Sequence, residues 1–133
     1  MKPTLEQGSI VVANKMRDPV PGDIIAVYYE NRILVSRLIG LPGDRIFIDG
    51  EGVVSVNDRV LPETYISDSN KAFGITDLTY PYQIPDGCYF VMGDNRNVAI
   101  DSRMSVFGCI NKEYFVGKII FCVWPLQRIG HVG

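Results

Sequence analysis

The amino-acid sequence predicts a mostly β protein, with antiparallel strands arranged as a barrel or a sandwich and with little helix. Three observations favour this class. Short runs rich in Val, Ile, Tyr and Phe recur along the chain. Turns rich in Pro, Gly, Asn and Asp separate these runs. The long segment without such a run, residues 62–87, shows no helical period.

The expected strands follow one another with a turn signal after most of them. The segment DPVPGD precedes the second strand, and LPGD follows the third. Asp49-Gly50 suits backbone at positive φ, and Asn57-Asp58 is typical of the turn of a small hairpin. Residues 62–87 are expected to form an extended connection with short edge strands. The strands expected elsewhere are 9–14, 23–29, 33–39, 45–48, 53–56, 60–61, 88–92 and 118–123.

Length and composition exclude several classes of protein. At 133 residues the chain can bury a core as one domain, 1–133, without disulfides. A formal net charge of −2 offers no basic surface for nucleic acid, and no apolar run is long enough to span a membrane. Cys88, Cys109 and Cys122 are widely spaced, which disfavours a metal site. We expect free thiols, with a Cys88–Cys109 disulfide as the alternative.

A hydroxyl interrupts the apolar run ILVSRLIGLPGDRI, residues 33–46. Strand alternation puts Ser36 on one face with Leu34 and Leu38, and puts Arg37 on the opposite face. A small polar side chain on an apolar face is either a structural hydroxyl that bonds nearby backbone or part of a site. The strand by itself leaves both interpretations open.

The segment GDNRNVAIDSR, residues 93–103, holds a dense alternation of charge in Asp94, Arg96, Asp101 and Arg103. Charges at this density are costly to bury unless they pair. The segment is therefore either a solvated loop whose charges neutralise one another or a rigid paired network that supports a site. Its own residues do not decide between the two.

Five segments, in order, resemble the sequence boxes of bacterial type I signal peptidase, the membrane-anchored serine–lysine protease family (S26) that removes secretory signal peptides. The resemblance covers nearly the whole chain. It implies the antiparallel signal peptidase fold, an extracytoplasmic position at the cell membrane, an anchor that this chain does not contain, no cofactor and no metal. The matching segments are MKPTL (1–5), GDIIAV (22–27), SRLIGLPGD (36–44), GDNRNVAIDSR (93–103) and the close of the chain from Gly117 to Gly130.

The departures from the family pattern fall on its catalytic positions. In the family a serine hydroxyl attacks the scissile carbonyl, and a lysine kept neutral by burial takes its proton. Ser36 stands where the resemblance puts that lysine, and the nucleophile aligns with the position before Met1. Ala99 replaces a serine that orients the lysine. The resemblance therefore implies degenerate catalytic positions, because a hydroxyl cannot replace an amine as general base.

The positions around the catalytic ones are retained. The resemblance implies a structural network beside the site, made of Arg37, Asp94, Asn95, Arg96, Asp101, Ser102 and Arg103. It implies a substrate groove in the neighbourhood of Met1, Pro3, Ile33, Leu34 and Val35. Family substrates bind in an extended form, main chain to main chain, so binding in such a groove does not require the lysine.

The sequence therefore favours a non-catalytic signal-peptidase-like protein of the Gram-positive type. Its expected partners are extended segments of secreted or pilin proteins, whose export or pilus assembly it assists, and the membrane surface, with no nucleic acid. The alternative is an active signal peptidase I, seen in a mutated or truncated form or using a base such as Lys2, Lys15 or His131. A third hypothesis is an interaction domain whose groove is closed by its own side chains.

Overall fold

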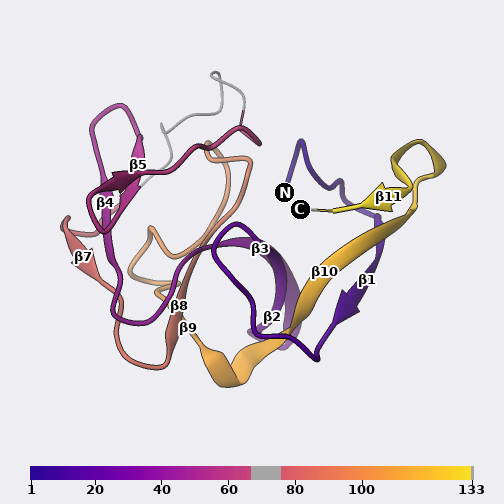
Figure 1. Ribbon diagram of the computed structural model, residues 1–133, viewed down its shortest axis with the longest axis horizontal. Helices are drawn as coiled ribbons and strands as arrows, with labels where there is room; N and C mark the ends of the chain where they lie inside the picture. Colours follow the sequence, from indigo (N-terminus) through magenta and orange to yellow (C-terminus); the bar gives the residue numbers. More distant parts are fainter. Residues whose placement is uncertain (67–75, 133) are drawn as a thin grey trace.

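The computed structural model describes residues 1–66 and 76–132, and the chain in these ranges is built mainly of antiparallel strands. The strands form two sheets. The long strand β3 (Arg32–Gly40) lies within the larger one, between β2 and β8, as Figure 1 shows. The mostly β fold class predicted from the sequence is confirmed.

The larger sheet has seven strands in the order β1-β10-β2-β3-β8-β9, with β11 paired to β10. Register shifts interrupt the pairing of β10 with β1 and with β2, and such irregularities increase the twist of a sheet. Besides β3, its strands are β1 (Ile10–Asn14), β2 (Ile24–Tyr29), β8 (Cys88–Met92), β9 (Ile110–Asn111), β10 (Phe115–Trp124) and β11 (Gly130–His131).

The smaller sheet has four strands in the order β6-β5-β4-β7 and lies at the left in Figure 1. Its strands are β4 (Arg45–Ile48), β5 (Val54–Val56), β6 (Arg59–Val60) and β7 (Tyr82–Gln83). Two 3₁₀ turns, η2 (Lys112–Tyr114) and η3 (Leu126–Arg128), flank β10. The hairpin between β5 and β6 turns at Asn57 and Asp58, both at positive φ.

Strand β3 contributes side chains to three apolar cores. Leu38 packs in the core between β2, β8 and β9, and Leu34 lies against the same core. Ile39 belongs to the core of the smaller sheet, and Val35 borders the core formed by β1, β2 and β10. The predicted alternation of Leu34 and Leu38 against Val35 and Ile39 is therefore confirmed. Strand β3 therefore holds the two sheets in place relative to each other.

Some details differ from the expectation, among them the bounds of β10, which begins at Phe115 and not at Lys118. The positive φ after β4 belongs to Gly52 (φ 78°) instead of Gly50. The cause is the Asp49 carboxylate, which accepts hydrogen bonds from the N–H groups of Glu51 and Val53 and so shapes a longer turn. The sequence also does not predict β9 or β11, because each has only two residues and so shows no alternation of apolar and polar side chains.

The three cysteines are free thiols in the structure. Cys122 is buried, and its thiol donates to the carbonyl oxygen of Trp124 at 3.1 Å. Burial, followed by contact with Cys109, raises the pKa of the half-buried Cys88 thiol to about 11. Because the thiolate is the reactive form, Cys88 is expected to be unreactive near neutral pH.

Alkylation with iodoacetamide tests the environment of Cys88. In the folded protein at about pH 8 we expect Cys88 to react about 100-fold more slowly than in the unfolded chain, because raising the pKa from 9.0 to about 11 lowers the thiolate fraction. Peptide mass spectrometry measures the rate at each cysteine. The neutral thiol stabilises the fold fully below pH 9, and this contribution disappears as the pH rises through about 11. Equal rates at about pH 8 would contradict the prediction.

Candidate functional site

Ser36 lies inside the larger sheet, opposite Ile25 of β2, and is 6% exposed. Within the described residues its hydroxyl makes no hydrogen bond to protein. No fully buried side-chain oxygen or nitrogen in that part of the chain lacks a partner, so the hydroxyl reaches solvent at its edge. Of the two interpretations open from the sequence, the structural hydroxyl bonded to backbone is therefore not what the structure contains.

Arg37, the next residue, forms a buried ion pair with Asp94. The Arg37 Nε donates to Asp94 Oδ1 at 2.8 Å, and Nη2 donates to Oδ2 at 2.6 Å. The Nη1 group donates to the carbonyl oxygen of Gly22 at 2.7 Å. The Asp94 carboxylate, which is 0% exposed, also accepts a hydrogen bond from the Thr4 hydroxyl. Two parallel charge-assisted bonds with these extra partners compensate the desolvation of both charges.

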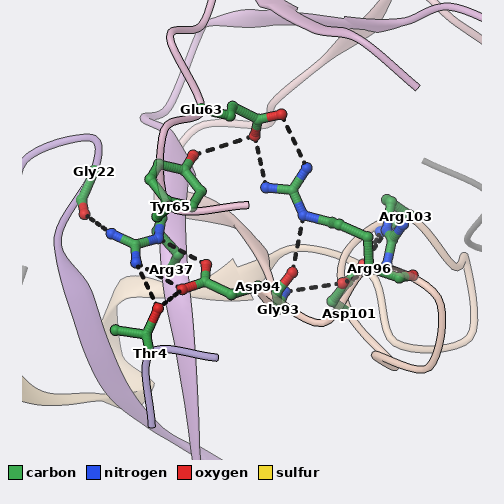
Figure 2. Close-up of polar contacts among 10 residues, drawn as sticks. All are labelled: Thr4, Gly22, Arg37, Glu63, Tyr65, Gly93, Asp94, Arg96, Asp101 and Arg103. Atoms are coloured by element: carbon green, nitrogen blue, oxygen red, sulfur yellow. Dashed lines mark hydrogen bonds and ion pairs between the residues drawn. The ribbon is translucent and has the colours of Figure 1, made fainter. Parts of the chain in front are cut away.

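Glu63 and Tyr65 complete this network, although the sequence analysis did not single them out. The guanidinium carbon of Arg37 lies 3.7 Å from the centre of the Tyr65 ring. Figure 2 shows the two side chains beside each other. The Tyr65 hydroxyl donates to Glu63 Oε1 at 3.1 Å. Burial and the Glu63 carboxylate raise the pKa of Tyr65, so the phenol stays protonated. Glu63 also pairs with Arg96 at 2.6 and 3.2 Å.

Arg96 thus pairs outside its own loop, whereas Arg103 pairs within it. The Arg103 Nε and Nη2 groups donate to the two oxygens of Asp101 at 2.8 and 2.9 Å. Asp101 also accepts the N–H of Gly93 at 3.0 Å, and Arg103 donates to the carbonyl of Arg96 at 2.9 Å. The residues Asp94, Arg96, Asp101 and Arg103 are each at most 3% exposed. The four charged side chains of the loop therefore form a buried, paired network and are not solvated.

Backbone contacts fasten the same loop to β8. The N–H of Val91 donates to the Ser102 hydroxyl at 3.0 Å, and the N–H of Ser102 donates back to the Val91 carbonyl. The Asn95 carbonyl accepts the N–H groups of Val98 and Ala99, which closes a tight turn. Asn95 and Ser102 therefore hold the shape of the loop while the arginines and acids fill it.

Ala99 packs against the chain segment that runs beside Ser36. Arg37 pairs with Met92 in β8, so the next step of the antiparallel register puts Ser36 beside Gly93. A Cβ atom built at Gly93 would lie only 2.6 Å from the Cβ of Ala99. The two positions at which the sequence departs from the family pattern, Ser36 and Ala99, therefore lie on adjoining segments.

One edge of β3 carries no strand partner just before Ser36. Strand β2 pairs with residues 32–37 on one side, while β8 begins its pairing at Arg37 on the other. Within the described chain, no strand pairs with residues 32–36 on that second side. A groove of about 600 Å³ lies along Arg32–Val35. Side chains of consecutive strand residues point to opposite faces of the sheet, so a groove that all four residues line must run along the edge of the strand. Such an edge can accept another strand.

Four of the five residues predicted for the groove line it: Met1, Ile33, Leu34 and Val35. Pro3 does not, because it is exposed and its carbonyl accepts a hydrogen bond from Arg128 at 2.6 Å. Apart from Arg32, the rest of the lining comes from the segment after Met1, which the sequence does not predict as part of the groove because residues 2–8 carry no strand pattern. The lining residues of this segment are Lys2, Leu5, Glu6, Gln7, Gly8, Ser9 and Val11.

Comparison with known proteins finds close sequence similarity over almost the whole chain. The family described as "Signal peptidase, peptidase S26" matches residues 1–124. Signal peptidase I of Bacillus caldolyticus is 34% identical over 142 residues, which cover 96% of this chain and 76% of that protein. Signal peptidase I P of Bacillus subtilis subsp. natto is 37% identical over 142 residues, with 98% and 76% covered.

A solved structure is similar as well. The crystal structure of a signal peptidase I from Enterococcus faecalis V583 matches with a TM-score of 0.66 at 28% sequence identity. The match covers 78% of this chain and 98% of that one. The arrangement of antiparallel strands described above is therefore similar to that of a signal peptidase I.

Removal of one partner from the buried ion pair tests how much the pair contributes to the stability of the fold. We expect Asp94→Ala to lower the free energy of unfolding by about 3–5 kcal/mol, because it leaves the Arg37 charge buried and unpaired. The control is Glu6→Ala, which removes the partner of Arg128 from a pair that is 37% and 44% exposed. That change should cost at most about 1 kcal/mol. Urea unfolding followed by circular dichroism measures both, and equal losses would contradict the buried role of Asp94.

Proposed function

The chain belongs to the signal peptidase family, peptidase S26, and on that premise we propose that it is a catalytically degenerate member of the family. In this proposal it binds extended segments of secreted proteins and assists their export or the assembly of pili. The observation that carries the proposal is a hydroxyl, Ser36, at the strand position where the family pattern has the lysine general base.

The surroundings of Ser36 support the loss of proteolysis. The position suits a neutral lysine, because Leu34, Leu38 and Ile25 surround it with apolar side chains and burial lowers the pKa of an amine. A serine hydroxyl has no lone pair that is basic near neutral pH, so it cannot take the proton of a nucleophile. The retained burial therefore favours a site that kept its packing and lost its base.

Ala99 is a second observation that supports the same proposal. A serine at this position would serve to orient the lysine ammonium, and that role has no purpose without the lysine. Ala99 is half-buried, and alanine leaves no hydroxyl there without a partner. Ala99 lies against Gly93, the residue that the β3–β8 register puts beside Ser36. Two departures in one small region are expected when selection for chemistry has relaxed.

Peptide binding is supported by the groove beside β3. The unpaired edge at residues 32–36 offers main-chain donors and acceptors, and the groove along it has an apolar floor that includes Met1, Leu5 and Val35. An extended segment can add to such an edge as a further strand, with its side chains alternating into the groove. None of these contacts requires a lysine side chain at position 36.

The proposed location is the extracytoplasmic face of the cell membrane, by analogy with the family. Among residues 1–66 and 76–132 the structure contains no helix with the length and apolar character needed to cross a bilayer. We propose that an anchor outside this chain tethers the domain, so that secreted or pilin segments reach the groove as they leave the membrane.

An active signal peptidase I is the second candidate. It is favoured by the names of the similar proteins, which are signal peptidases I. The lysine that could act as an alternative base is Lys2, which lines the groove beside Met1, whereas Lys15 does not line it. His131 is a poorer candidate, because it pairs in β11 and its ring packs against Phe121.

Cleavage of a signal-peptide substrate separates the two candidates. The natural protein, extended to include the residue before Met1, should release no product, because it lacks the base. A variant with Ser36→Lys, Ala99→Ser and a serine at the upstream position should cleave after a small-x-small motif. The matched control carries Ser36→Met, which has a long side chain but no amine, and should be inactive. Mass spectrometry identifies the products, and cleavage by the natural protein would overturn the proposal.

Binding of an extended peptide tests the groove itself. We expect a fluorescent peptide with a small-x-small motif to bind the natural protein, as measured by anisotropy. Ile33 lines the groove and is 53% exposed, so Ile33→Glu should weaken binding by about fivefold through the loss of about 1 kcal/mol of apolar contact. Val60→Glu, at a 65% exposed position of β6, is the control and should change nothing. Absence of binding by the natural protein would favour a domain with a closed groove.

A further inference from the structure

A second hollow lies at the tip of the β2–β3 hairpin and shares no lining residue with the groove. Its volume is about 610 Å³. The tip is a turn of two residues, Glu30 and Asn31, both at positive φ (46° and 63°). The site discussed above uses neither residue. The lining consists of Tyr28, Tyr29, Glu30, Asn31, Cys88, Phe107, Cys109, Ile110, Asn111 and Tyr114.

Aromatic rings form the walls of this hairpin-tip pocket. Tyr28 and Tyr114 are 54% and 49% exposed, although tyrosine rings usually bury much of their surface. The rings of Tyr29 and Phe107 lie deeper, with their centres 4.5 Å apart and their planes tilted by 31°. Phe107 and Ile110 belong to the buried core and close the floor. The face of an aromatic ring carries partial negative charge, so such walls attract a cation.

Glu30 gives the pocket a negative charge, which adds to the partial negative charge of the ring faces. Glu30 is the one charged residue of the lining, and it is exposed. It makes no ion pair or side-chain hydrogen bond with any described residue. Lys112, the neighbour of Asn111, does not line the pocket, and its ammonium nitrogen lies 5.7 Å from the centre of the Tyr89 ring. The carboxylate of Glu30 is therefore available to a ligand.

We propose that the hairpin-tip pocket binds the basic side chain, Arg or Lys, of a partner polypeptide. The apolar stem of such a side chain can pack on Tyr28 and Tyr114 while its charged end meets the rings and the Glu30 carboxylate. An acidic side chain would be repelled by Glu30 and by the ring faces. A neutral side chain could fill the space, but its affinity would not depend on Glu30.

Nuclear magnetic resonance titration of the ¹⁵N-labelled chain with N-acetyl-arginine methylamide tests the proposal. We expect saturable shifts of the amide signals of residues 28–31, 111 and 114 at millimolar concentrations. The citrulline analogue has nearly the same shape but no charge, and it should bind about tenfold more weakly. Equal affinity for the two ligands, or shifts confined to other residues, would overturn the proposal.

Variants of single carboxylates complete the test. Glu30→Gln keeps the shape of an exposed turn residue, so the dispersed spectrum of a folded chain should persist, and arginine affinity should fall about threefold to tenfold. Citrulline affinity should be unchanged in this variant. Glu51→Gln, in the exposed turn after β4, is the matched control and should leave both affinities unchanged. If Glu30→Gln binds arginine as well as the natural chain does, the carboxylate has no part in recognition and the proposal fails.

Discussion

The buried ion pair between Arg37 and Asp94 is the constraint on which the rest of the site depends. Neither charge can leave water unless every hydrogen-bonding group around it is satisfied. The pair therefore requires the Gly22 carbonyl, the Thr4 hydroxyl and the ring of Tyr65 in fixed positions. These three partners come from separate parts of the chain. Their positions in turn set the course of β3 and of the N-terminal segment that closes the groove.

A second set of pairs extends this order into the loop at 93–103. Glu63 links Tyr65 to Arg96, and Arg103 with Asp101 fixes the backbone at Gly93. These groups are engaged with one another in hydrogen bonds and ion pairs. The network consequently does the same structural work whether or not a lysine stands at position 36. The fold and the groove therefore do not depend on which side chain stands at position 36.

The sequence predicts the longer elements and the retained network more readily than the partners of that network. Strands 45–48 and 88–92 have the predicted bounds because apolar runs and turns delimit them clearly. The resemblance located Arg37, Asp94, Asp101 and Arg103, but no pattern connects Arg96 to Glu63 or Arg37 to Tyr65. Those contacts join the segment after β6 to β3 and to the loop at 93–103, and spacing along the chain carries no information about them. Pro3 was expected in the groove for the same reason, since neighbours in sequence can face opposite ways.

Strand β3 reaches all three apolar cores, and this has a consequence for how the molecule can open. A segment that belongs to one core can detach while the others persist. Residues 35–39 cannot, because freeing them would expose Val35, Leu38 and Ile39 to water and disrupt three cores together. The least costly fluctuation that releases this strand is thus close to global unfolding. The two sheets behave as one cooperative unit, and the centre of the molecule is kinetically the most protected part of its backbone.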